Sequence, residues 1–320
     1  MSSAGTTVSR HPLASLSAHD DTARLRRGYL LGLLGVALFA LTIPMTRLAS
    51  GSAVAPQLSP WFVALGRAAV AGVLAALYLW AVRAPWPSAA QWRSLALTAA
   101  GVVFGFPLFM GLAVVRVDAV HASVVTGILP LVTAALGAWW LRQPQRPAFW
   151  LCAWTGLALV VAFAWWRGGA ALQPADGLLA LALLLGAMGY VSGARLSTTM
   201  RPEHVISWVL VLALPVTVPM AVSTWPTAPV QPSSWLGFAY VSLCSMWLGF
   251  FAWYRALALG GTVRVSQVQL LQPFLSILAA VPLLGERVDA ATCVFLLAVM
   301  GVVFASRRVA RTGFSPKETR

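Results

Sequence analysis

Long apolar runs separated by short polar breaks fill most of the chain. A helix needs about 20 mainly apolar residues to cross a bilayer, and ten runs approach that length. The expected spans are 28–49, 60–82, 93–115, 119–141, 147–167, 176–196, 204–224, 234–257, 261–284 and 289–307. The breaks between them are rich in Pro, Gly, Ser and Arg. This pattern predicts an all-α integral membrane protein with ten transmembrane helices.

The composition agrees with that class. Only 9% of the 320 residues are charged, against about 25% in soluble domains. The formal net charge of +14 could suit a nucleic acid, but the cations lie in short loops between apolar spans, so no nucleic-acid partner is expected. The three cysteines, Cys152, Cys244 and Cys293, lie in apolar stretches without a CxxC. We therefore expect no disulfide framework, no metal and no cofactor.

The basic residues predict an orientation. With the N-terminus in the cytoplasm, every one of the 22 lysines and arginines falls on the inner side except Arg47, Arg67, Arg116, Arg167 and Arg287. This is the positive-inside bias of a multi-pass protein in a cell (inner) membrane with both termini cytoplasmic. Residues 1–27 and 309–320 are the expected cytoplasmic tails. The first span follows its polar tail without an A-x-A site, and we interpret it as a retained signal-anchor.

The two halves of the chain resemble each other. Residues 120–143 align without a gap on residues 263–286, so that Pro130 meets Pro273 and Ser123 meets Ser266. We therefore expect two repeats, 28–167 and 176–308. Because each holds five spans, the second enters the membrane in the opposite orientation, as in many secondary transporters, around a central cavity. The alternative is chance similarity between helices rich in Leu, Val and Ala.

Each of the two repeat helices carries a stripe of polar residues, and the two stripes occupy corresponding faces. At 100° per residue, one face of the ninth span collects Thr262, Ser266, Gln269, Gln272 and Ser276, whereas Gln267 lies off it. The corresponding positions of the fourth span are Ser123, Thr126, Leu129 and Thr133. Polar groups facing lipid lose hydrogen bonds at several kcal/mol each, so the stripes are expected to line the cavity. The alternative is that they only hydrogen-bond neighbouring helices together.

Other polar or aromatic residues inside spans are candidates for the same cavity. Pro130 and Pro273 remove backbone donors near mid-span and favour a hinge or a binding role, although membrane helices tolerate proline generally. Arg67 lies inside the second span, where a cation usually faces the bundle interior; alternatively, it snorkels to the headgroups or caps a helix. The aromatic candidates Tyr190, Trp247 and Trp253 could also serve only in packing.

Coupling to protons needs an ionisable group on the ion path. No Asp or Glu occupies the centre of an expected span. Either the substrate moves alone, or a proton is coupled through a residue at a span end, for which His121 and Glu286 are the candidates. His121 could instead have an interfacial role.

At these residues the chain resembles the EamA-type transporters of the drug/metabolite transporter superfamily. LGRAAVAG around Arg67, ILPLVTAALGAWWLR at 128–142, FFAWYRALA at 250–258 and QPFLSILAAVPLLGE at 272–286 carry the resemblance, which extends over residues 28–308. It implies a ten-helix inverted-repeat fold that moves small metabolites through a central cavity, often with ion coupling. One departure is Arg142-Gln143, where the family usually has an acidic residue after the fourth span.

The expected function is that of a carrier. The spans contain no HExxH, paired acids or GxSxG, so an enzyme is not expected, and pseudo-two-fold halves do not favour a channel. Amides, hydroxyls and one arginine suit a small polar or zwitterionic metabolite, such as an amino acid whose carboxylate meets Arg67, moved by an exporter. A hydrophobic drug, a nucleotide derivative or a non-transporting scaffold are the alternatives. The oligomeric state stays open.

Overall fold

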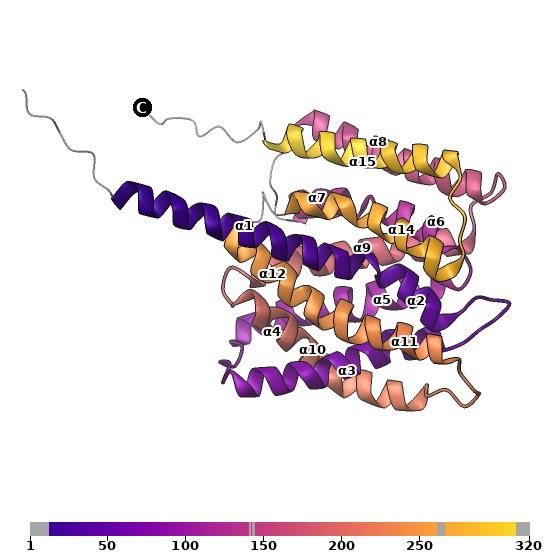
Figure 1. Cartoon of the computed structure of the whole chain (residues 1–320), viewed down its shortest axis with the longest axis horizontal. Helices are drawn as coiled ribbons and strands as arrows, with labels where there is room; N and C mark the ends of the chain where they lie inside the picture. The colour runs from indigo at the N-terminus through magenta and orange to yellow at the C-terminus, as the bar shows by residue number, and fades with distance from the viewer. Residues whose placement is uncertain (1–12, 141, 143–144, 261–265, 312–320) are drawn as a thin grey trace, which may run out of the picture.

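The computed structural model describes residues 13–140, 142, 145–260 and 266–311, and this part of the chain is helical (Figure 1). The first half contains α1 (Leu13–Ala40), α2 (Thr42–Ser50), α3 (Pro60–Ala81), α4 (Ala89–Thr98), η1 (Ala99–Gly105), α5 (Phe106–Val114), α6 (Ala119–Thr126), α7 (Leu129–Trp140) and α8 (Pro147–Arg167). The second half contains α9 (Pro174–Leu196), α10 (Pro202–Ser223), α11 (Pro232–Tyr240), η2 (Val241–Leu248), α12 (Gly249–Gly260), η3 (Ser266–Leu271), α14 (Gln272–Leu284) and α15 (Ala290–Arg311).

These elements join into the apolar segments expected from the sequence. Within the described residues, eight helical stretches are long and apolar enough to cross a membrane, from Arg24–Ser50 to Pro232–Ala256. Two shorter apolar helices follow, Val268–Leu284 and Ala290–Ser306. The predicted all-α membrane class is therefore confirmed. The helix of the first span is longer than expected, because α1 already begins within the predicted tail 1–27.

Proline defines the start of half of the spans. Pro60, Pro147, Pro174, Pro202 and Pro232 each occupy the first turn of a helix. The first turn needs no backbone donor, and the fixed φ of proline is already helical. Each of these prolines follows a short polar loop, so the chain reverses direction and the helices pack side by side.

The packing of the helices follows a regular scheme. The contacts between the two halves include those of α1 with α12, α3 with α10, α5 with α9, α6 with α14, and α8 with α15. In span numbers these are 1 with 8, 2 with 7, 3 with 6, 4 with 9, and 5 with 10. Exchanging each span with the one five positions away converts this set of pairs into itself. The inverted layout of 28–167 and 176–308 stays a prediction, which this scheme supports.

The two ends of the described chain lie at the same end of the bundle. In Figure 1, α1 begins and α15 ends on the left, while α8 and α15 lie together along one edge. Such an arrangement requires an even number of crossings. It agrees with the expectation that both termini share one side of the membrane.

Two clusters of buried apolar side chains form the interior. One surrounds α6, α8, α9 and α15 and includes Phe163 and Leu179. The other surrounds α1, α3, α10 and α12 and includes Val36 and Leu210. Tyr190 packs against both clusters. The region between the two clusters is where the candidate site lies.

Candidate functional site

A cavity lies between the two clusters, at the middle of several helical segments. Its walls combine apolar side chains, such as Phe39, Phe106 and Phe250, with hydroxyl, amide and guanidinium groups. The centre of a water molecule can reach about 60 Å³ of it. Since one water needs about 10–15 Å³ on this measure, the cavity holds a few waters or a small molecule in this conformation.

Eight of the residues expected from the sequence line this cavity together. They come from α3, α6, α7, α9, η3 and α14 and are Arg67, Thr126, Pro130, Tyr190, Gln269, Gln272, Pro273 and Ser276. The glutamine stripe of the ninth span and part of the hydroxyl stripe of the fourth therefore meet at one hollow. No described side chain forms a hydrogen bond with the amide of Gln269 or Gln272, so both amides are available to a ligand.

Four other expected residues are not among the lining residues. Ser123 is fully buried, and its Oγ lies 2.8 Å from that of Ser276. The Thr133 hydroxyl donates to the Leu129 carbonyl of its own helix at 2.8 Å. Trp247 packs against Phe251, and Trp253 is only 8% exposed.

None of the four is among the residues that line the cavity in this conformation, and their part in the substrate path stays a prediction. The expected wall residues Ser266 and Thr262, like the off-face Gln267, lie outside the side chains that the structure describes.

Arg67 is the charged residue of the cavity wall. Its side chain is buried, with 5% of its surface exposed. One terminal nitrogen lies 3.3 Å from the sulfur of Met246, and Nε has no hydrogen-bond partner. Among the described residues, no carboxylate lies within ion-pair distance of it. A buried cation without a counter-ion is unfavourable, so the site is suited to an anionic group from a ligand.

The fourth and ninth spans are both interrupted beside the cavity. α6 ends at Thr126 and α7 begins at Leu129, just before Pro130. In the ninth span the 3₁₀ helix η3 gives way to α14 at Gln272, just before Pro273. Proline lacks the N–H that would bond the carbonyl four residues earlier.

In this way the carbonyls of Thr126 and Gln269 lose a helical donor, and both residues line the cavity. The two interruptions also lie against each other. A methyl group added at Gly127 would lie 2.9 Å from Cε of Met300 and 3.5 Å from Cγ of Pro273. The helices approach closely here, and a larger residue at position 127 would require the end of the Met300 side chain to move.

Two π-helical turns, which the sequence did not indicate, border the same hollow. η1 contributes Val102 from the third span, and η2 contributes Ser245 from the eighth. The Ser245 hydroxyl lies 2.8 Å from that of Thr42, another lining residue. A wide turn leaves local carbonyls less constrained, and such turns occur often at functional sites. A single hydroxyl in an apolar span gave no sequence signal for Thr42 or Ser245.

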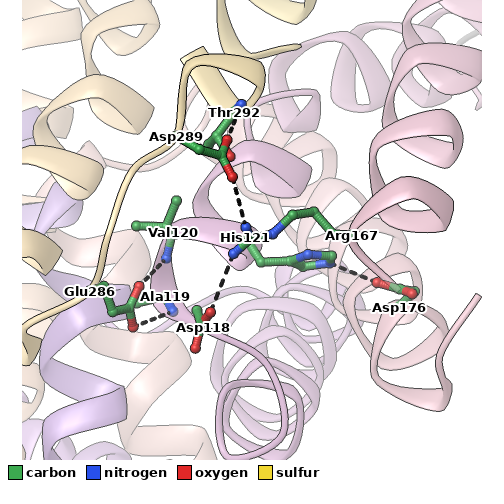
Figure 2. A network of polar contacts seen from close by, with 9 residues as sticks. All are labelled: Asp118, Ala119, Val120, His121, Arg167, Asp176, Glu286, Asp289 and Thr292. Carbon is green, nitrogen blue, oxygen red and sulfur yellow. Dashed lines mark hydrogen bonds and ion pairs between the residues drawn. The ribbon is translucent and has the colours of Figure 1, made fainter. Parts of the chain in front are cut away.

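The coupling candidates lie away from the cavity, at the start of α6 (Figure 2). The Glu286 carboxylate accepts hydrogen bonds from the backbone N–H groups of Ala119 and Val120, each at 2.7 Å. It therefore caps the helix from the loop between α14 and α15. Burial raises the pKa of the Glu286 carboxyl above its ordinary value, although these donors and Arg47 act in the opposite direction.

His121 belongs to a second set of contacts at the same end of α6. Its Nε2 lies 2.8 Å from a carboxylate oxygen of Asp176 in α9. Beside it, Arg167 of α8 pairs with Asp118 at 3.4 Å and with Asp289 at 3.2 Å (Figure 2). Charged and polar contacts thus connect α6 to α8, α9 and the segment before α15 at one end of the bundle.

No ligand set for a metal ion emerges from the described residues, in which no three His, Cys, Asp or Glu side chains gather suitably. The fold and the cavity are those of a multi-pass helical membrane protein with a polar, cation-bearing interior. That combination is typical of membrane carriers.

Comparison with known proteins agrees with this class. The model of the EamA-like transporter family matches residues 26–166 and again residues 173–307. "Uncharacterized transporter YdeK" of Bacillus subtilis (strain 168) is 40% identical over 286 residues, which are 89% of this chain and 98% of that protein. A crystal structure with 18% identity covers 90% of this chain and 99% of its own, with a TM-score of 0.61, and shows the fold alone. The chain belongs to the EamA-like transporter family and is a membrane transporter, not an enzyme.

Proposed function

We propose that this transporter is a secondary carrier that exports a small polar or zwitterionic metabolite, of the size and charge of an amino acid, through the cavity around Arg67. The observation that carries the proposal is the buried Arg67 guanidinium, which has no carboxylate within ion-pair distance among the described residues. A substrate carboxylate would supply the missing charge, and the planar guanidinium fork matches its two oxygens.

The rest of the lining supports a substrate with both polar and apolar parts. The side-chain amides of Gln269 and Gln272 can both donate and accept hydrogen bonds. Phe39, Phe106 and Phe250 give the opposite character, a surface for an apolar group. An α-amino acid presents a carboxylate, an ammonium group and a side chain, which these groups can bind together.

The alternatives fit less well. A hydrophobic drug would leave Arg67 without a counter-ion in a site from which water has been displaced. A nucleotide derivative is larger than a hollow of which only about 60 Å³ is reachable by the centre of a water molecule. A non-transporting scaffold has no need of polar groups directed into an internal cavity.

The proposed mechanism is alternating access between two inverted repeats, 28–167 and 176–308. The interruptions before Pro130 and Pro273 supply two matched flexible points beside the substrate. The pairs of contacting helices stay the same when the two halves are interchanged, which supports the repeat assignment. Movement of α6 against α14 at these points would open the cavity first to one side and then to the other.

The orientation and the driving ion are part of the same proposal. The protein lies in the inner membrane with both termini in the cytoplasm, an orientation that rests on the distribution of its arginines. Either the substrate moves alone or protons drive it through Glu286 or His121. Glu286 is favoured, because protonation would remove its negative charge from the two N–H groups that it caps.

Transport from loaded proteoliposomes tests the proposal. Vesicles carrying the purified protein are filled with a mixture of labelled amino acids, and release is compared with that from protein-free vesicles. Release of one or a few amino acids, inhibited by an excess of the same unlabelled compound, is expected. Release that is equal for the whole mixture would indicate a pore, and no release above that from protein-free vesicles would contradict a carrier of this substrate class.

A further inference from the structure

A groove lies between the end of α3, the loop that follows it and the first half of α10. These parts of the helices lie at the end of the bundle where α1 begins (Figure 1). Its walls include Trp80, Trp86, Trp208 and Val211, with Arg83 at its rim. The centre of a water molecule can reach about 610 Å³ of it. This groove is separate from the cavity around Arg67 and shares no lining residue with it.

The aromatic residues place the groove at the depth of lipid headgroups. Trp80 is 81% exposed and Trp86 is 79% exposed, next to the loop that follows α3. Exposed tryptophans in membrane proteins collect at the headgroup level, where the ring meets both acyl chains and water. Trp86 covers Trp208, with ring centroids 5.0 Å apart. The indole N–H of Trp208 is buried and has no acceptor among the described residues.

Arg83 occupies an unusual backbone position at the rim. α3 ends in a Schellman motif, in which Ala84 N–H donates to the Leu79 carbonyl at 2.9 Å and Arg83 N–H donates to the Trp80 carbonyl at 3.1 Å. The motif needs a left-handed residue after the helix, usually glycine. Arg83 adopts φ 49° there. A left-handed backbone is uncommon for a non-glycine residue, and in this chain Arg142 and Ala170 share it, so it supplies a matched control for Arg83.

The charge around the groove selects the occupant. Close to Tyr78 in the last part of α3 lie the charges of Arg201, Arg255 and Glu203, so the basic residues there outnumber the acidic one. The excess of positive charge favours an anionic ligand, and the exposed tryptophans favour one with acyl chains. Basic pockets between membrane helices bind anionic lipid headgroups in this manner.

From these observations we infer that the groove is a binding site for an anionic phospholipid. Arg83 contacts the phosphate, Trp80 and Trp86 enclose the glycerol region, and the acyl chains follow α3 and α10. The site does not depend on the identity of the transported substrate. It gives the protein a preference for anionic lipid at one face, which stabilises the end of α3.

The matched variants are Arg83→Gly and Arg142→Gly. Arg142 also has a left-handed φ, of 50°, and is exposed, but it does not line the groove. Each change removes one arginine and relieves the same backbone strain, so neither is expected to unfold the protein. The full-length protein is purified in a neutral detergent. Its melting temperature and the lipids retained in native mass spectrometry are measured with added phosphatidylglycerol or phosphatidylcholine.

We expect phosphatidylglycerol to raise the melting temperature of the wild type and of Arg142→Gly more than phosphatidylcholine does. Arg83→Gly should bind phosphatidylglycerol about fivefold more weakly, the factor expected for one arginine near an anionic headgroup, and be no less stable than the wild type in phosphatidylcholine. Equal loss in both variants would overturn the inference, because the attraction would then be general. A rise in melting temperature with soluble glycerol phosphate equal to that with phosphatidylglycerol would also overturn it, because it would indicate a phosphate site without a lipid. Full retention of phosphatidylglycerol by Arg83→Gly would overturn it as well.

Discussion

Replacement of Gln272 by leucine separates a substrate contact from a helix contact. The Gln272 side chain is half-buried in the cavity wall and makes no hydrogen bond to another described residue. Leucine is also the residue at the aligned position of the other repeat, Leu129, which lines the same cavity. Because no internal hydrogen bond is lost, the melting temperature should stay within about 3 °C of the wild type, which corresponds to less than about 1 kcal/mol in a chain of this size.

The effect on transport should be much larger. A substrate group left unpaired in a buried site costs about 1–3 kcal/mol, which corresponds to about a 5- to 150-fold loss of apparent affinity. Release from loaded proteoliposomes at several substrate concentrations measures this loss. Thr133→Val is the matched control, because the Thr133 hydroxyl bonds to its own helix and lies outside the lining. If Gln272→Leu transports normally but melts earlier, the amide only ties helices together, as an average bond of about 0.6 kcal/mol does.

Two further predictions concern coupling and topology. Since burial raises the pKa of the Glu286 carboxyl, this group takes up a proton at a higher pH than an exposed glutamate does. We therefore expect Glu286→Gln to abolish accumulation of substrate driven by an imposed pH gradient. Accumulation that survives the loss of both Glu286 and His121 would exclude both as the coupling site. Reporter fusions after Arg142 and after Arg201 should report the cytoplasm and one near Thr227 the outside, whereas a cytoplasmic signal at Thr227 would contradict the inverted repeat.

The positions of the spans were predictable because hydrocarbon thickness and backbone hydrogen bonding constrain them strongly. The cavity wall was partly predictable for the same reason. Gln269, Gln272 and Ser276 follow one another at helical spacing, and lipid disfavours an amide, so their common face had to be an interior one. The change from the 3₁₀ helix η3 to the α-helix α14 leaves all three residues in the cavity wall.

The remaining wall residues depend on pairings between distant segments. Ser123 belongs to the same stripe as Thr126. Its hydroxyl lies against that of Ser276 in the ninth span, and Ser123 is not among the residues that line the cavity. Trp247 and Trp253 have no periodic feature that distinguishes packing from lining. The π-helical turns η1 and η2 lie where neighbouring helices approach closely, as at Gly101 in η1. At Gly101, for example, a methyl group would lie 2.3 Å from the Leu185 carbonyl oxygen.

Of the polar contacts at the start of α6, the sequence predicted only two of the participating residues and none of the pairings. The sequence marked His121 and Glu286 as ionisable groups at span ends. That Glu286 caps α6 could not be read from it, because the two segments are 166 residues apart and meet only after the halves have packed. Asp118 in a loop and Arg167 at the end of an expected span had no partner that the sequence indicated, and their pairing is evident only in the folded chain.

The central claim is that Arg67 binds an anionic group of the transported molecule. The most direct measurement is counterflow of labelled amino acids in proteoliposomes containing equal amounts of wild type, Arg67→Lys and Arg67→Ala. The wild type should exchange its substrate. Arg67→Lys, which keeps the charge without the planar fork, should do so more weakly, and Arg67→Ala should not do so while still inserting and melting as a folded protein. Exchange at the wild-type rate and apparent affinity by Arg67→Ala would contradict the account.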